Sequence, residues 1–269
     1  MDIERGRIFF LGAGFSAGAG IPLTQNLLPL AAQHFSECAS GLFERVCGYA
    51  KDVDVDLSAS PDAEDFARLC THLEFVELAE YAGGERWSDA GSREKLALKF
   101  FLSKAIALST PDSLKIPNIY HEFVANLKEN DLIITFNWDV LLEIVLHSVR
   151  QPFTYTFEPG CLNIAKMHGS INWIKNAPKK MRKDRPSFEY NELDFVYGLL
   201  SHRIYASELL QSPRSWSDCY PLIDEVSPLI VLPGFGKAYD VRDLSMLWYR
   251  PEFLSLRRGG VSIIGLSVS

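Results

Sequence analysis

A glycine-rich turn follows the first apolar run of the chain. The run Ile8–Leu11 reads as a buried strand, and the sequence GAGFSAGAGIP after it contains four glycines before a helix expected from about Leu27 to Cys38. In a strand-turn-helix unit, backbone amides of the turn can point at an anion held near the helix N-terminus. The pattern therefore predicts that a pyrophosphate lies close to Gly12 and Gly14. The alternative is a tight turn that binds no ligand.

Polar residues also follow the other apolar runs. Asn137 and Asp139 come after residues 132–136, and His168 comes after residues 164–167. Gly265 and Ser267 come after the last run. Because ligands of open parallel α/β sheets bind at the carboxyl ends of the strands, these side chains are expected to converge.

Two kinds of element must position these residues. The apolar runs 7–11, 132–136, 164–167, 229–232 and 261–264 predict an α/β fold, with a Rossmann-like parallel sheet flanked by helices. The last run is expected to lie at a sheet edge or to precede a helix that the sequence lacks. The helix after the glycine-rich turn is expected to be capped by Thr24 or Asn26, and another helix is expected to begin near Trp138.

The segment 41–110 has a different character. Apolar residues such as Phe66, Leu69 and Leu73 recur there at helical spacing, without glycine-rich or catalytic patterns. The segment is therefore interpreted as a helical lobe inserted into a single domain that spans residues 1–269.

Composition restricts the possible classes of protein. The net charge of −7 argues against general nucleic-acid or membrane binding. The five cysteines form no Cys-x-x-Cys pair, which favours a reduced, cytoplasmic protein without a structural zinc site. No apolar stretch approaches the about 20 residues that span a bilayer, and the charged N-terminus is not typical of a signal peptide.

Five motifs together resemble the sirtuin-like NAD-binding family. In order along the chain, they are GAGFS with GIP at residues 12–22, TFNWD at 135–139, HGS at 168–170, FG at 235–236 and GLS at 265–267. The spacing of the first motif, Gly-x-Gly-x-x-x-Gly, and the lack of a ribose-binding acid about 20 residues later argue against an ordinary dehydrogenase.

The chain departs from the sirtuin deacylases in three places. Leu23-Thr24 replaces their Phe-Arg pair, their zinc-binding cysteine pairs are missing, and Lys237 stands where they have an acid. The helical insert, the Thr-Phe-Asn-x-Asp form and the sequence LWYR at residues 247–250 are instead similar to the sirtuin-like NAD hydrolases of bacterial antiphage defence.

This resemblance implies roles for individual residues. Asn137 would orient water or the ribose, although an asparagine there could instead cap the next helix. His168 would accept a proton near neutral pH. Asp139 would face the cationic nicotinamide or a ribose hydroxyl, or else bond to the next helix. The NAD-binding residues would be Gly12, Ala13, Gly14, Ser16, Asp139, Gly265 and Ser267.

The expected activity is cleavage of NAD, as a substrate and without a metal, to nicotinamide and ADP-ribose. The same resemblance implies a defence effector that assembles with its own copies or with a second defence protein. Two alternatives stay open, namely a module that binds NAD or ADP-ribose without turnover, and a protein ADP-ribosyltransferase or deacylase. Trp138 and Trp173 are expected in the core rather than as surfaces that stack on a base.

Overall fold

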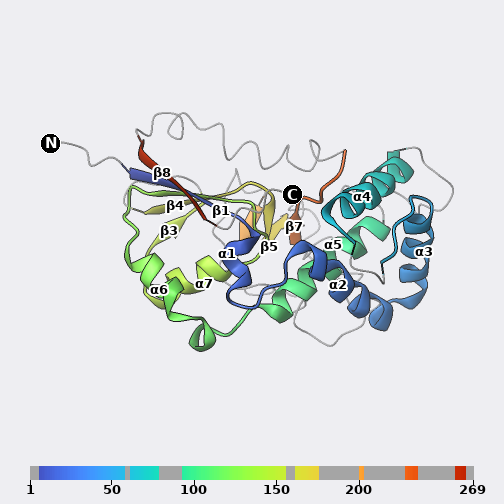
Figure 1. The fold of residues 1–269 in the computed structure, drawn as a ribbon, viewed down its shortest axis with the longest axis horizontal. Coiled ribbons are helices and arrows are strands. Elements are labelled where there is room, and N and C mark those ends of the chain that lie inside the picture. The colour runs from blue at the N-terminus through green and yellow to red at the C-terminus, as the bar shows by residue number, and fades with distance from the viewer. Residues whose placement is uncertain are drawn as a thin grey trace, which may run out of the picture.

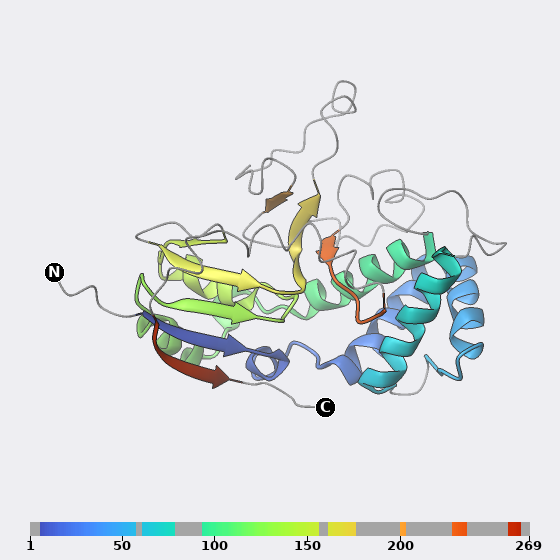
Figure 2. The ribbon, with the colours of Figure 1, turned by 90° about the horizontal axis from the view of Figure 1, so that it is seen from above.

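The centre of the fold is a parallel sheet. The computed structural model describes residues 6–57, 61–78, 93–155, 161–175, 200–202, 228–235 and 258–264. Five strands form the sheet in the order β3-β4-β2-β1-β8, and all pair in parallel (Figure 2). They are β1 (Gly6–Leu11), β2 (Leu132–Thr135), β3 (Phe153–Thr154), β4 (Leu162–Lys166) and β8 (Arg258–Ile264). The predicted α/β fold is confirmed, and β8 lies at one edge of the sheet.

Both faces of this sheet bury apolar side chains. Phe9, Leu11 and Ile133 belong to the main core, whereas Leu132 and Ala165 form a second, small cluster. Burial on both faces explains why the strands read as continuous apolar runs rather than as alternating patterns.

Two helices cover one face of the sheet (Figure 1). They are α6 (Asn118–Ala125), which the sequence did not predict, and α7 (Leu141–Ser148). Phe123 of α6 packs edge-on against Phe9 of β1, with ring centroids 5.6 Å apart. The expectation that α7 begins near Trp138 is wrong by three residues, because the Asp139 carboxylate accepts the amide of Leu141 at 3.1 Å and so marks the start of the helix.

The predicted insert is helical. It contains α3 (Ser40–Lys51), α4 (Ala63–Leu78) and α5 (Arg93–Ser109). A short 3-10 helix, η1 (Ser113–Lys115), follows the insert. Figure 1 shows α2 (Thr24–Cys38) beside these helices, at the end of the molecule away from β3. Stacked rings of Phe35 and Phe101, 4.5 Å apart, join α2 to α5. The helical lobe in space is therefore α2 to α5.

The helix starts differ in how they are capped. Asp62 and Asp65 bond reciprocally through their side chains and amides at the start of α4, as in a capping box. At α2 the predicted caps are wrong, because the helix begins at Thr24, after Leu23, and makes no side-chain cap hydrogen bond. The packing of buried Leu27, Leu28 and Phe35 against the lobe supports this helix instead.

The run 229–232 does not join the parallel sheet, which corrects the expectation that five strand ends converge. Residues Pro228–Ile230 form β7 in a separate antiparallel sheet with β5 (Gly169–Lys175) and β6 (Leu200–His202), in the order β6-β5-β7. The chain turns sharply at Gly169, which has a φ of +75°, and β5 leaves the parallel sheet there. β7 then pairs with β5 rather than with β4.

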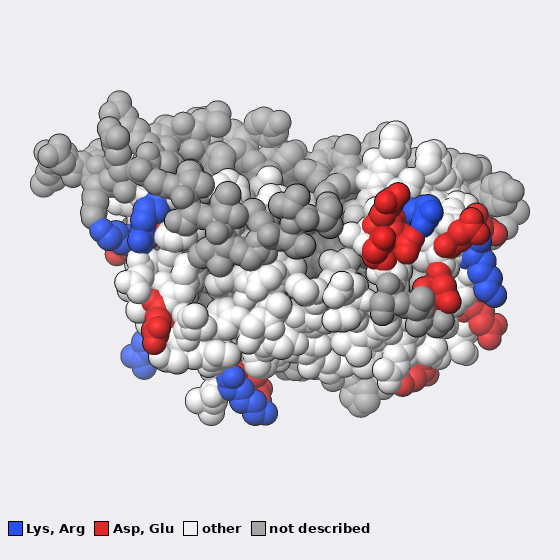
Figure 3. Space-filling view, in the orientation of Figure 1, with Lys and Arg blue, Asp and Glu red and all other residues white. Residues whose placement is uncertain are grey.

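Charge is unevenly spread over the described surface. On the face in Figure 3, acidic side chains gather over α3 and α4 of the lobe, and the region over α1, α2 and α7 is nearly uncharged. Among the described helices, none is long and apolar enough to cross a membrane.

Candidate functional site

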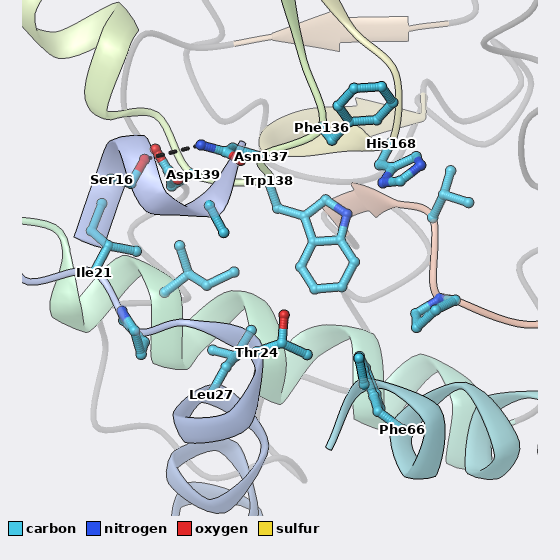
Figure 4. Close-up of a pocket in the computed structure, with 16 residues that line it drawn as sticks. Ser16, Ile21, Thr24, Leu27, Phe66, Phe136, Asn137, Trp138, Asp139 and His168 are labelled. Carbon is cyan, nitrogen blue, oxygen red and sulfur yellow. Dashed lines mark hydrogen bonds between the residues drawn. The ribbon is translucent and has the colours of Figure 1, made fainter. Parts of the chain in front are cut away.

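A cavity of about 260 Å³ lies where the carboxyl ends of β1, β2 and β4 meet the helical lobe (Figure 4). In the strand order, β1 has β2 on one side and β8 on the other. The cavity lies at the carboxyl ends of β1, β2 and β4, which is the edge of an open parallel α/β sheet where ligands bind. The cavity thus occupies the place expected for a ligand.

The glycine-rich sequence forms the first wall. It folds into the short helix α1 (Ala13–Ala17), with Gly12 as its N-cap residue. Ala13 and Ser16 line the cavity, whereas Gly12 and Gly14 are not among its described lining residues. Gly12 is buried and Gly14 is exposed. Their NAD-binding roles stay predictions, and Ser16 is the residue of this turn that presents a polar side chain to the cavity.

Asn137 connects the end of β2 to this turn. Its Nδ2 donates to the carbonyl oxygen of Gly12 at 2.9 Å and to Oγ of Ser16 at 3.2 Å. It does not cap α7, which begins four residues later. The side-chain carbonyl oxygen takes part in neither bond, and it can accept a hydrogen bond from a ligand or water at the cavity.

Asp139 is buried, with 8% of its surface exposed, and lines the same cavity. Its carboxylate accepts the amide of Leu141 at 3.1 Å. Burial raises the pKa of Asp139, although Lys166, Ser16 and the Leu141 amide oppose this rise. Ser16 therefore accepts a hydrogen bond from Asn137, and the same side chain favours the ionised form of the Asp139 carboxyl, which lowers its pKa.

His168 reaches the cavity from the turn between β4 and β5. Its ring packs edge-on against Phe136, with centroids 5.2 Å apart, and its carbonyl oxygen accepts the amide of Val231 at 2.9 Å. A Cβ on the next residue, Gly169, would lie 2.0 Å from the carbonyl oxygen of Leu229. The imidazole is thus held by a turn whose shape requires glycine.

A buried ion pair behind the cavity was not predicted. Lys166 Nζ donates to Oε1 of Glu143 at 2.8 Å and to the backbone oxygen of Asp139 at 2.5 Å. The hydroxyl of Tyr155 donates to the same Oε1 of Glu143 at 2.9 Å, and burial raises the pKa of Tyr155 well above its usual value. A lysine inside the apolar run 164–167 and a glutamate inside the apolar sequence LLEIVL were the available signals.

The lobe provides an apolar wall, which sequence reasoning also missed. Leu27 of α2, Phe66 of α4 and Ile106 of α5 line the cavity opposite the strand ends. Trp138 both packs against the core, as predicted, and lines the cavity. The cavity therefore has a polar side, formed by the turn and strand ends, and an apolar side formed by the lobe.

The segment after β7 joins this site to α4. Val231 and Pro233 line the cavity. Phe235, 75% exposed, donates its amide to Thr71 Oγ1 at 3.2 Å and stacks on Phe75. Phe235 begins the FG motif of residues 235–236. Four residues discussed above lie outside the described part of the chain, namely Gly236, Lys237, Gly265 and Ser267.

Comparison with known proteins adds no relative. No protein-family model matches the chain, and no curated protein matches it. Within the described part of the chain, no three His, Cys, Asp or Glu side chains form a group that could hold a metal ion. The chemistry of the cavity residues is therefore the basis for a functional proposal.

Proposed function

We propose that this protein is an NAD glycohydrolase. The observation that carries the proposal is that Asn137, Asp139 and His168, from the ends of two parallel strands, line one cavity with Ser16 of the glycine-rich turn. The sequence resemblance to sirtuin-like NAD hydrolases assigns Asn137 and His168 to the cleavage of NAD, and Ser16 and Asp139 to its binding. The site and the motifs thus support one reaction.

The reaction balances with water as the second substrate. The bond between the ribose C1′ and the nicotinamide nitrogen breaks, and its electron pair leaves with the nicotinamide. Water adds through its oxygen to C1′, and His168 accepts the proton that this water loses. The Asn137 carbonyl oxygen orients the water or a ribose hydroxyl, and the buried Asp139 carboxylate stabilises the positive charge that develops on the ribose.

The size of the cavity fits one end of this substrate. A volume of about 260 Å³ is below the range of about 300–1,000 Å³ common for pockets that enclose a drug-sized ligand. It suits the nicotinamide and its ribose. In this proposal the phosphates then extend toward α1.

The test is release of nicotinamide from NAD by the purified protein. Asn137→Ala and His168→Ala are each expected to slow release by about a hundredfold or more, the scale for loss of a positioning group or a general base. Asn126→Ala and His121→Ala, both on or beside α6, are matched controls that remove the same side chains outside the cavity. Near-normal turnover in both site variants would remove Asn137 and His168 from the mechanism.

One observation favours a second candidate, a module that binds NAD or ADP-ribose without turnover. The amide nitrogen of Asn137 is already engaged by Gly12 and Ser16, which is what a purely structural asparagine would do. Calorimetric binding of NAD without release of nicotinamide would identify this function. Release that requires an added protein acceptor would instead indicate a transferase or deacylase.

The proposal extends to a cytoplasmic effector of antiphage defence that assembles with its own copies or with a second protein. It is supported only by the sequence resemblance. A loss of cellular NAD on phage infection, present with the wild-type gene and missing with His168→Ala, is the expected result.

A further inference from the structure

The indole of Trp138 has a hydrogen-bond donor that no described residue accepts. Its Nε1 is buried from solvent and has no hydrogen-bond acceptor among the described residues. In Figure 4 the ring lies amid the side chains that line the cavity, with its nitrogen on the edge toward His168. A buried N–H group without an acceptor is destabilising, and such a group in a native structure calls for an explanation.

The position of this ring is fixed from behind. The carbonyl oxygen of Trp138 accepts the amide of Ile171 at 2.9 Å and the hydroxyl of Ser170 at 3.2 Å, so that β5 holds the backbone. The side chains of Phe66, Ile106 and Val231, which share the cavity with the indole, contain no acceptor. The donor therefore belongs to a ring that lines the cavity, and it has no acceptor among the described residues.

We propose that Trp138 Nε1–H donates a hydrogen bond to the carboxamide oxygen of the nicotinamide ring, and so selects a base that carries an acceptor. This inference rests on the proposed function. The nitrogen edge of the indole lies toward His168, which in the proposed function acts at the scissile bond, and the base beside that bond is therefore placed next to Trp138. The flat indole and the apolar lobe wall suit an aromatic ring, and the single N–H supplies its orientation.

The experiment compares two ligands and two variants by calorimetric titration. The first ligand is carba-NAD, in which a methylene group replaces the ribose ring oxygen, so that the nicotinamide is not cleaved. The second is ADP-ribose, which has no nicotinamide. Trp138→Phe, which keeps an aromatic ring but removes the donor, is expected to bind carba-NAD about tenfold more weakly and ADP-ribose as the wild type does. Trp173→Phe, a buried tryptophan outside the cavity, is the matched control and is expected to change neither affinity.

The outcomes separate the inference from the function on which it rests. A wild-type protein that does not bind carba-NAD overturns both. Equal binding of carba-NAD by wild type and Trp138→Phe, or equal weakening of both ligands, overturns the donor role alone. If Trp138→Phe does not fold, competition against carba-NAD on the wild type decides, because nicotinamide should then compete at least about tenfold better than 3-methylpyridine, which lacks the acceptor. Equal competition by the two bases contradicts the inference.

Discussion

Two glycines with similar backbone angles differ in their surroundings. Gly20 and Gly169 have φ angles of +90° and +75°, yet an added Cβ meets nothing within 4 Å at Gly20 and lies 2.0 Å from the Leu229 carbonyl oxygen at Gly169. Gly20→Ala is therefore expected to destabilise the fold by about 1–2 kcal/mol, from backbone strain alone. Gly169→Ala is expected to destabilise it clearly more, because β5 and β7 must also separate.

Urea unfolding of the two variants measures this difference. Because Gly169 follows His168, the Gly169→Ala protein that still folds is also expected to lose nicotinamide release. Gly20→Ala should retain most of it. Equal stability of the two variants would show that the clash with the Leu229 carbonyl oxygen adds no cost to the backbone strain at Gly169.

The convergence of the site residues could be predicted from sequence, because parallel strands end at one edge of a sheet. Ser16, Asn137, Asp139 and His168 do line one cavity, although their roles stay predictions. The hydrogen bonds among them could not be predicted. Ser16 meets Asn137 only because α1 turns directly after Gly12, and no local pattern indicates that geometry.

Among the elements, β4 and α7 are joined through the pair Lys166–Glu143. Both side chains are almost fully buried, and Lys166 also holds the backbone of Asp139. Lys166→Met leaves the Glu143 carboxylate without its cation and is expected to destabilise the fold by about 3–5 kcal/mol. Urea unfolding measures this loss.

A double variant is the control for this pair. Lys166→Met with Glu143→Leu removes both charges and is expected to recover much of the stability, since apolar pairs can replace buried ion pairs. It should not recover nicotinamide release, because the hydrogen bond to Asp139 is still missing. Full recovery of release would confine Lys166 to a structural role.

At the opposite ends of β1 and β2, Asp131 makes stability depend on pH. Burial alone would raise the pKa of Asp131, but hydrogen bonds from the Arg7 side chain, its amide and the Lys128 amide outweigh burial and lower it below 3.8. As the pH falls, the unfolded chain is protonated first. The stabilisation is thus complete above about pH 4 and is lost as the pH falls through the lower pKa of the folded state.

Asp131→Asn is expected to have a lower free energy of unfolding than the wild type at pH 7. Between about pH 5 and 2 it is expected to lose less of that free energy than the wild type does, and the difference equals the contribution of the Asp131 carboxylate. Asp112→Asn removes the same charge from an exposed position and serves as the control. Parallel acid unfolding curves for wild type and Asp131→Asn would contradict the prediction.

Apolar runs in the sequence predicted most strands of the parallel sheet, but they did not predict which strands pair with each other. Residues 229–232 have the same apolar character as 132–136, and periodicity does not indicate which sheet a strand joins. The partner of β7 depends on the turn at Gly169, a long-range feature. Likewise β3, with two residues, is too short to give a pattern.

Across the whole molecule, the cavity has walls from both the sheet and the lobe. Phe66 and Ile106 lie on α4 and α5, and His168 lies at the end of β4. A ligand in the cavity is therefore expected to slow amide hydrogen exchange in α4 and α5 as well as in the strand ends. Exchange measured with and without carba-NAD tests this. Helix α3, which contributes no residue to the described cavity lining, is the internal control, and protection confined to the strand ends would show that the lobe wall makes no contact with the ligand.

The segment 231–235 has a thermodynamic consequence. Its first amide bonds to the carbonyl oxygen of His168, and its last amide bonds to Thr71 of α4. In addition, α5 contacts both β5 and β7. Loss of structure in the lobe would remove the support of this segment and free the turn that carries His168. The helical lobe and the parallel sheet should therefore unfold in a single cooperative transition. A state in which the sheet is folded and the lobe is unfolded should not be populated.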